Sequence, residues 1–437
     1  MSEKLLRTLG PWDLTAIGIN GVIGSGIFVL PAAVASLTGT WSPVVYLFSG
    51  LVTFLIALCF AEAGTYFTTA GGPYLYVREA FGPFAGFQVG WFTWLVRATS
   101  AAAVSHAFTA YLGYFLPFVK QGLTQTIVTS TVLLSLMLVN LLGVRYGAWS
   151  VNLFTLGKLL PLAVFIGAGL FHLQAKSLLP LGKVSANHLG EAALLLVFAF
   201  GGFENLTIPA EEAAQPQRDI PKALLTTMTL VTITYVLIQI VAVGTFSGLA
   251  ESKTPLASAC AGFLGPLGGA LITWGALIST TGTVSGLMLT GPRLTYALAD
   301  HGQLPALFGQ VHSRFRTPAL SILFFGAVSF ALTLSGSFIQ LAGLSAIARL
   351  FQYVPTCLAL LKLRKMSCSN CQHFRLPFGS LIPCLAIILC IGLLLQSSFS
   401  QWLLSAGAIC LGCLIYLARR SGCGRGRKEG APVEPPA

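Results

Sequence analysis

The sequence contains few charged residues for its length. Asp, Glu, Lys and Arg make up 9% of its 437 residues, whereas a soluble domain has about 25%. A surface with so little charge could not face water, which excludes a soluble globular protein. Apolar stretches near the roughly 20 residues needed to cross a bilayer recur along the whole chain. We predict an all-α polytopic membrane protein with about 12 transmembrane helices, at approximately 12–37, 42–67, 86–113, 124–142, 148–171, 190–210, 222–249, 263–290, 316–336, 338–361, 377–396 and 401–418.

Motifs of membrane-embedded enzymes are also missing. The chain contains no H-E-x-x-H, G-x-S-x-G or Walker A pattern and no pair of aspartates in its apolar stretches. It has no repeated filter motif or charged ring of the kind that selects ions in channels. An enzyme and a channel are therefore both disfavoured, and the sequence predicts no cofactor and no metal site.

Cysteine forms no evident disulfide framework. The ten cysteines lie mostly in apolar stretches, where a thiol behaves as a small hydrophobe. The exception is the pair Cys368 and Cys371, which is followed by His373. This spacing can bind a metal or cycle between thiol and disulfide. Because no second pair of ligands accompanies it, we favour a reduced loop.

Basic residues outnumber acidic ones, for a formal net charge of +12. When the predicted helices alternate across a membrane with the N-terminus inside, most of the 25 Lys and Arg residues fall at cytoplasmic ends and loops. The positive-inside rule therefore predicts two cytoplasmic termini and an even number of spans. We interpret the basic run from Arg419 to Lys428 as an orientation determinant that contacts anionic lipid, not as a nucleic-acid site.

Glycines interrupt the first apolar stretch, in the run GVIGSGIF from Gly21 to Phe28. Unwound backbone inside a membrane is tolerated only where it lines a cavity enclosed by protein. A second glycine break lies between Phe198 and Glu204, in the sixth stretch. Paired breaks are typical of transporters built from inverted repeats, with the substrate site between the repeats. We expect two five-helix repeats (1–171 and 172–361), two peripheral helices (362–418) and a basic cytoplasmic tail (419–437).

The first break offers hydrogen-bond donors. Its amides would form the N-terminus of an outer half-helix, which carries a partial positive charge and free N–H groups. The α-carboxylate of a substrate is the natural ligand for such a site. The predicted carboxylate-binding residues are Gly24, Ser25, Gly26 and Ile27.

Several ionisable residues are predicted at membrane depth. A lysine at the middle of a membrane helix, such as Lys158, costs about 2.5 to 3.5 kcal/mol on insertion scales. Lys158 therefore extends to the membrane interface, pairs with a structural partner or has a role in transport. Arg97, Arg349 and Glu204 also lie inside apolar stretches. Glu204 is a candidate partner for either arginine, and we favour a buried polar network over direct contact with substrate.

Five motifs in order along the chain resemble those of the amino acid, polyamine and organocation transporter superfamily. They are Gly24 to Phe28, Gly71 to Trp91, Phe198 to Glu204, Glu211 to Pro221, and Gly291 to Arg293. The resemblance covers nearly the whole chain and is closest to bacterial amino acid permeases related to cationic amino acid transporters. It implies the leucine-transporter fold, in which two inverted five-helix repeats contain unwound helices 1 and 6.

The resemblance also implies roles for individual residues. Lys158 would place its ammonium group where sodium-coupled relatives bind an ion, between the first and eighth helices. A lysine removed from water releases a proton more readily, so it would serve proton symport or act as a fixed cation for exchange. Its candidate hydroxyl partners are Ser279, Thr280 and Thr283. The carbonyls expected to hold the substrate amino group belong to Val22, Phe198, Ala199 and Gly201, and Phe200 or Phe203 is either a gate or a core residue.

The combined prediction is a secondary active transporter. We favour sodium-independent, proton-coupled symport of neutral L-amino acids by alternating access. The alternatives are an amino acid exchanger and a carrier of cationic amino acids or polyamines, although a polyamine lacks the carboxylate that the first break would bind. The expected partners are an amino acid, a proton and the lipid bilayer, and the oligomeric state stays open.

Overall fold

The computed structural model describes residues 10–67, 71–120, 122–142, 148–179, 181–207, 213–312, 316–366 and 374–422. Within these ranges the chain is helical and contains no strand. The predictions for Cys368 and Cys371, the motif residues Glu211 and Glu212, and most of the basic tail lie outside the described residues. The α-helices are α1 (Pro11–Val22), α2 (Gly26–Thr38), α3 (Ser42–Thr65), α4 (Gly72–Phe81), α5 (Pro83–Phe115), α6 (Gly122–Leu141), α7 (Ala148–Leu170), α8 (Ala175–Leu178), α9 (Ala186–Phe200), α10 (Pro216–Thr245), α11 (Pro255–Asp300), α12 (Ala319–Ser335), α13 (Phe338–Met366), α14 (Leu381–Leu394) and α15 (Phe399–Gly422).

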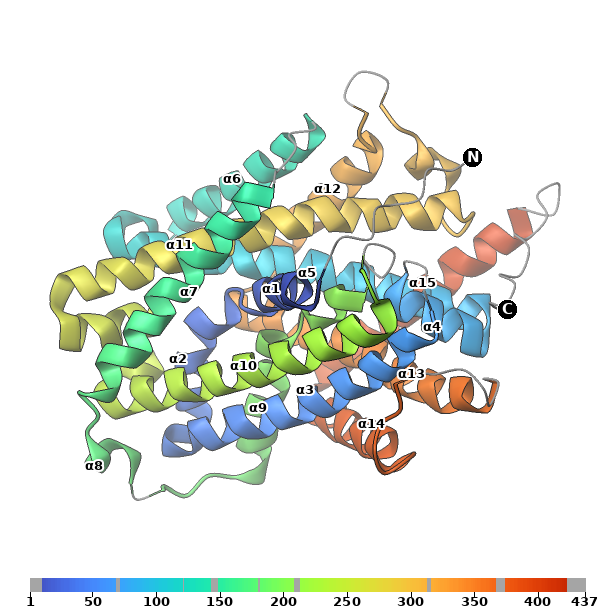
Figure 1. The fold of residues 1–437 in the computed structure, drawn as a ribbon. Helices are drawn as coiled ribbons and strands as arrows, with labels where there is room; N and C mark the ends of the chain where they lie inside the picture. The colour runs from blue at the N-terminus through green and yellow to red at the C-terminus, as the bar shows by residue number, and fades with distance from the viewer. Residues whose placement is uncertain are drawn as a thin grey trace.

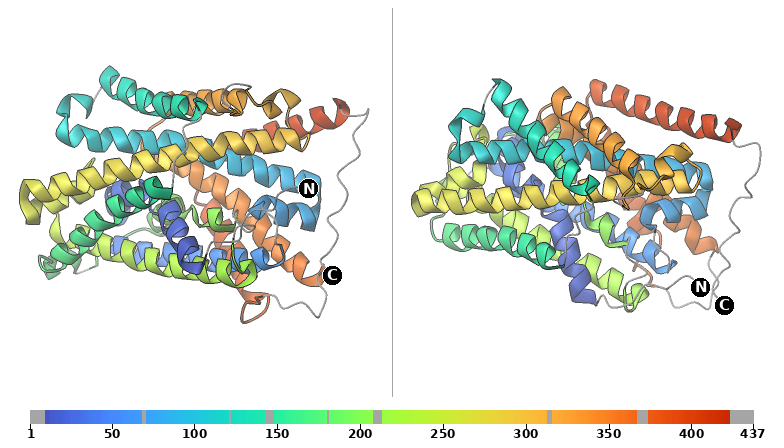
Figure 2. Two further views of the ribbon diagram at one scale, coloured as in Figure 1. Left: turned by 45° about the horizontal axis from the view of Figure 1, so that its top comes forward. Right: turned by 90° about the horizontal axis from the view of Figure 1, so that it is seen from above.

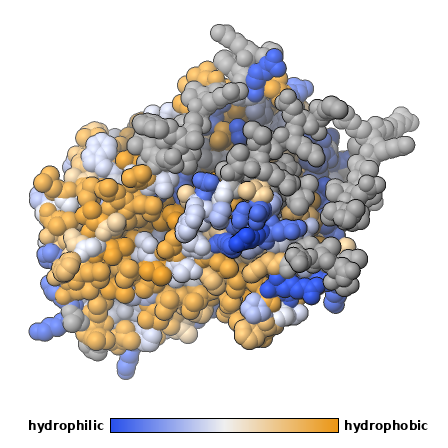
Figure 3. Space-filling view, in the orientation of Figure 1, coloured by the Kyte–Doolittle hydropathy of each residue, from blue (hydrophilic) through white to orange (hydrophobic). Residues whose placement is uncertain are grey.

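The long helices run side by side, as expected of a membrane bundle (Figure 1). Seven helical stretches in the described residues are long and apolar enough to cross a bilayer, and three shorter apolar helices accompany them. Large apolar side chains such as Leu51, Ile388 and Leu403 are more than half exposed. Apolar residues cover much of the visible surface (Figure 3). An apolar surface of this extent contacts lipid, so the chain is a multi-pass membrane protein, while the count of 12 spans stays a prediction.

Both glycine-rich segments are broken, as the sequence predicts. The first consists of α1 and α2, separated by Ile23, Gly24 and Ser25. In the second, α9 ends at Phe200, and the 3-10 helix η3 (Phe203–Thr207) follows after a two-glycine turn. The short helices α1 and α2 lie among α9, α10 and α11 (Figures 1 and 2). This arrangement brings backbone without regular helical hydrogen bonds into the interior of the bundle.

Candidate functional site

The two breaks contact each other directly, and glycine makes the contact close. A Cβ atom on Gly26 would lie 2.8 Å from the Cα atom of Ala199. Gly202 has φ +116°, which favours glycine, and a Cβ atom there would lie 2.3 Å from the carbonyl oxygen of Gly21. The backbones of the two breaks, which are about 180 residues apart in sequence, therefore lie against each other.

Three of the four predicted carboxylate-binding amides have no backbone acceptor among the described residues. These are the amides of Ser25, Gly26 and Ile27, at the N-terminus of α2. The Gly24 amide is different, because it donates to the Val22 carbonyl oxygen at 2.9 Å. The side-chain oxygen of Ser25 is buried and also has no partner in the described part of the chain. The first break thus offers three amides and a hydroxyl.

Carbonyl oxygens of the two breaks lie beside the Tyr235 hydroxyl of α10. That hydroxyl is 3.2 Å from the Val22 oxygen and 3.3 Å from the Ala199 oxygen. No backbone amide in the described ranges donates to the carbonyls of Phe198 and Gly201. Of the four carbonyls predicted to hold an amino group, those of Val22 and Ala199 therefore contact Tyr235. Those of Phe198 and Gly201 accept no hydrogen bond from a backbone amide of the described residues.

Lys158 reaches the first break from α7. Its Nζ atom donates to the carbonyl oxygens of Ile23 at 2.8 Å and Asn20 at 3.2 Å, and the residue is 1% exposed. These carbonyls lie at the C-terminal end of α1, where the helix dipole concentrates negative partial charge. The alternative that Lys158 extends to the membrane interface is therefore wrong.

The expected hydroxyl partners of Lys158 bond elsewhere. Thr280 and Thr283 donate to carbonyls of their own helix, at 2.7 Å to Ala276 and 2.8 Å to Ser279. Ser279 donates to the Gly24 carbonyl at 3.4 Å, and Thr283 lies beside Gly24. Because a carbonyl four residues earlier lies within reach of a threonine hydroxyl in a helix, these hydroxyls need no lysine. Ser279 and Thr283 thus adjoin the first break, and no hydrogen bond from any of the three to the Lys158 ammonium group is recorded among the described residues.

Phe200 and Phe203 are both fully buried. Phe203 packs edge-on against Phe60 with ring centroids 5.4 Å apart. Phe200 packs against Tyr235 at 5.1 Å. In this conformation both rings are core residues, and a gating role for either one stays a proposal.

Glu204 is paired with Arg349 of α13, one of the two predicted partners. Its other oxygen accepts hydrogen bonds from the Gly202 amide at 2.8 Å and the Tyr353 hydroxyl at 3.1 Å. The Arg349 guanidinium occupies the space beside Gly201, where a Cβ atom would lie 2.5 Å from Cζ. Since Gly201 lacks a side chain, the charged group can approach the unwound backbone closely.

Arg97 does not pair with Glu204. Its guanidinium donates to the Thr290 carbonyl oxygen of α11 at 2.8 Å. It nevertheless lines the same small cavity as Glu204 and Arg349, with a volume of about 50 Å³. The predicted pairing of Glu204 with Arg97 is therefore absent from this structure, in which Glu204 pairs with Arg349 and Arg97 lines the same cavity.

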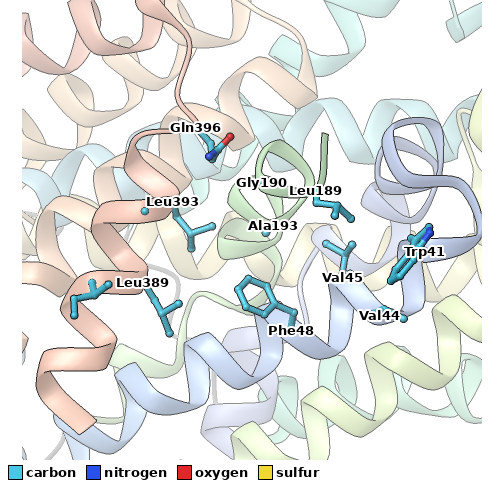
Figure 4. A pocket seen from close by; sticks show the side chains of 12 residues that line it. Trp41, Val44, Val45, Phe48, Leu189, Gly190, Ala193, Leu389, Leu393 and Gln396 are labelled. Atoms are coloured by element: carbon cyan, nitrogen blue, oxygen red, sulfur yellow. The ribbon is translucent and has the colours of Figure 1, made fainter. Parts of the chain in front are cut away.

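A larger cavity of about 520 Å³ lies elsewhere, among α3, α9 and α14 (Figure 4). Its lining is almost entirely apolar and includes Phe48, Leu189 and Leu393. The indole N–H of Trp41 donates to the Gly182 carbonyl at 2.7 Å. With no charged side chain and no predicted site residue in its lining, this cavity does not match the two charged ends of an amino acid.

Sequence reasoning missed Tyr235 and Tyr353. The one available signal was a single phenol inside each apolar stretch, and buried phenols usually have a hydrogen-bond partner. Which carbonyl or carboxylate they contact depends on packing. Among the described residues, no group of three His, Cys, Asp or Glu side chains is placed to hold a metal ion.

Known proteins resemble this chain over most of its length. Residues 9–417 match the family model described as amino acid permease. The chain is 30% identical over 396 residues to the serine/threonine exchanger SteT of Bacillus subtilis, covering 88% of this chain and 89% of SteT. It is 28% identical to the branched-chain amino acid permease BcaP of the same bacterium, over 95% of this chain and 93% of BcaP. The human Asc-type amino acid transporter 1 is 30% identical, over 82% of this chain and 72% of that protein.

Proposed function

The chain belongs to the amino acid permease family, whose members are transporters and not enzymes, and we propose that it carries neutral L-amino acids by sodium-independent proton symport. The proposed fold is the leucine-transporter fold with two inverted five-helix repeats. Alternating access would come from one group of helices rocking around the broken segments. We propose that both termini lie in the cytoplasm of a bacterial cell.

The observation that carries this proposal is the contact between the two breaks. Unpaired amides at Ser25, Gly26 and Ile27 suit a carboxylate, and the free carbonyls of Phe198 and Gly201 suit an ammonium group. Both groups occur on every amino acid. The backbone would therefore bind the part that all substrates share, and side-chain preference would come from the surrounding helices.

The preference for neutral side chains rests on the charges near the second break. The one described carboxylate there, Glu204, is already paired with Arg349. A cationic side chain would meet two arginines and find no free acid. The names of BcaP and SteT, a branched-chain amino acid permease and a serine/threonine exchanger, are consistent with neutral substrates.

Lys158 is the proposed coupling residue. Its ammonium group binds two carbonyls at the C-terminal end of α1, and no salt bridge to a carboxylate is recorded for it among the described residues. Loss of the proton would remove the charge that holds the end of α1 to α7. A change in protonation would thereby alter the position of the first break. Symport requires such a link between the proton and the substrate site.

Exchange is the second candidate, and the same contacts favour it. An ammonium group bound by two carbonyls is also suited to remain charged throughout the cycle. It would then act as a fixed cation, and the loaded carrier alone would reorient. SteT, a relative over most of the chain, is named as an exchanger.

Uptake into liposomes distinguishes the two candidates. The purified chain is reconstituted, and the internal pH and the internal amino acid are varied separately with labelled alanine, serine and leucine outside. Accumulation in empty vesicles under an inward proton gradient supports symport. A strict requirement for internal amino acid supports exchange, and absence of specific uptake of any amino acid would reject the proposed function.

A further inference from the structure

The small cavity beside the second break contains polar groups that the protein leaves unpaired. Gln352 is fully buried, and neither its amide nitrogen nor its amide oxygen has a partner among the described residues. The Nε atom of Arg349 is also unpaired in that part of the chain. Buried polar groups nearly always have a hydrogen-bond partner. A hydrogen-bond acceptor inside the cavity, which both residues line, would supply the partner that the Gln352 amide nitrogen and the Arg349 Nε atom lack, and an accompanying water molecule could donate to the amide oxygen.

The cavity also carries an excess positive charge. Among the described residues, its charged lining consists of Arg97, Arg349 and Glu204. Both carboxylate oxygens of Glu204 are engaged, one with Arg349 and the other with Gly202 and Tyr353. Arg97 contacts only the neutral Thr290 carbonyl in the recorded hydrogen bonds. A charge at membrane depth without a counter-ion is unfavourable, so the cavity suits an anion better than water.

The size of the cavity limits what it can hold. A water molecule needs about 10 to 15 Å³ of such volume, and the cavity measures about 50 Å³. That is enough for a halide ion with a water molecule, or for one carboxylate group, but not for a whole amino acid. The occupant is therefore distinct from the backbone part of the proposed substrate.

We propose that Arg97, Arg349 and Gln352 form a binding site for a small monovalent anion, with the chemistry of a halide or a carboxylate. The anion would accept hydrogen bonds from the two guanidinium groups and the amide nitrogen, and it would balance the charge of Arg97. Its source is either chloride from solution or the side-chain carboxylate of an acidic amino acid at the adjoining break. A halide at this site goes beyond the proposed function, whereas an acidic side chain there would replace its preference for neutral substrates.

Thermal unfolding of the purified full chain tests the site without requiring transport. Melting temperatures are compared in sodium chloride and in the sodium salt of the sulfonate buffer MES at equal ionic strength, because MES has no carboxylate and is too large for the cavity. A ligand that binds only the folded state raises the melting temperature, here by about 2 °C at roughly ten times its dissociation constant. We expect this increase in the native chain and its loss in Arg97→Gln and Gln352→Leu. Lys176→Gln, which changes an exposed cation on α8, should retain it.

A second arm identifies the source of the anion. In the MES buffer, L-glutamate and L-glutamine are added separately. Stabilisation by glutamate alone that disappears in Arg97→Gln assigns the site to an acidic side chain, whereas stabilisation by chloride alone assigns it to a halide.

Two results would overturn the proposal. One is equal melting temperatures in chloride and MES with no difference between glutamate and glutamine, as expected for a cavity filled with water. The other is an increase that persists in both Arg97→Gln and Gln352→Leu, which would place the anion elsewhere. Gln352→Leu decides the question if Arg97→Gln does not fold. Loss of uptake in the liposome assay, by contrast, bears only on the proposed function.

Discussion

The two helix breaks meet in the same interior, yet different charges hold them. At the first break, Lys158 of α7 donates to two carbonyls at the end of α1. At the second, Arg349 of α13 lies against Gly201 and pairs with Glu204 of η3. In both cases a cation from a distant helix approaches the end of a half-helix, where carbonyl groups concentrate negative partial charge. The two cations occupy the same kind of position.

What differs is the counter-ion. Arg349 has a carboxylate partner, and a guanidinium group stays protonated in proteins. Lys158 has no recorded carboxylate partner among the described residues, and a lysine exchanges its proton when it is removed from water. We infer that the second break holds a constant charge and the first holds a charge that can change. In the proposed repeats, α7 and α13 are the last helices of the first and second repeat. One carries the charge that can change, and the other carries the constant charge.

The largest expected effect comes from breaking the pair at the second break. Arg349→Met leaves Glu204 buried without a counter-ion, and we expect a loss of stability of about 3 to 5 kcal/mol. The double variant Arg349→Met with Glu204→Gln should recover much of this loss, because it removes both charges. Chemical denaturation in detergent measures both. Equal stability of the single variant and the native chain would contradict a structural ion pair.

Filling the contact between the breaks should have the next largest effect. Gly26→Val places a branched side chain where Cα of Ala199 lies 2.8 Å from a single Cβ. We expect substrate affinity to fall about 100-fold, or about 2.7 kcal/mol, because the backbone of α9 cannot move aside like a flexible side chain. The control is Gly167→Val, since nothing lies within 4 Å of a Cβ there. Binding of labelled substrate to the inserted protein measures the difference, and unchanged affinity counts against a carboxylate site at Gly26.

Changing the cation at the first break sharpens the comparison of the two charges. Lys158→Met should reduce uptake about tenfold and remove its dependence on the proton gradient, because the carbonyls of Asn20 and Ile23 lose a charged donor. Lys158→Arg keeps a charge that cannot be released. It should therefore retain exchange between internal and external amino acid while losing proton-driven accumulation. Uptake in Lys158→Met that still follows the proton gradient would exclude Lys158 as the coupling residue.

The smallest effect should come from the hydroxyl shared between the breaks. Tyr235→Phe removes the contact with the Val22 and Ala199 carbonyls but keeps the ring packing on Phe200. One neutral hydrogen bond contributes about 1 kcal/mol, so we expect stability to fall by that amount and the apparent affinity for substrate to change by less than about tenfold. Denaturation and substrate titration on one preparation measure both effects. A larger loss of affinity would indicate that the hydroxyl itself contacts the substrate.

The sequence located both breaks because their cause is local. Glycines at Gly24, Gly26, Gly201 and Gly202 weaken a helix wherever they occur, and the chain is interrupted beside each of them. The same reasoning identified the buried charges, since a lysine or arginine inside an apolar stretch needs a partner. It could not identify the partners. Lys158 binds backbone carbonyls, which every residue has, so no pattern of side chains marks them.

The ion pair at the second break shows where sequence reasoning ends. Glu204 had two candidate partners, and it pairs with Arg349 because α13 packs beside η3, while Arg97 on α5 turns to a carbonyl of α11. The hydroxyls of Ser279, Thr280 and Thr283 were assigned to Lys158 by resemblance, and their bonds to nearer carbonyls were visible only in the structure.

Local sequence determined that this chain lies in a membrane and that two of its segments break at glycine-rich runs, because each property depends on residues close together in the chain. Tertiary structure alone decided which amides remain unpaired, which arginine neutralises Glu204 and which carbonyls accept hydrogen bonds from Lys158. Hydrogen bonds and ion pairs act over about 3 to 4 Å, and only packing brings groups that are 100 or more residues apart within that distance.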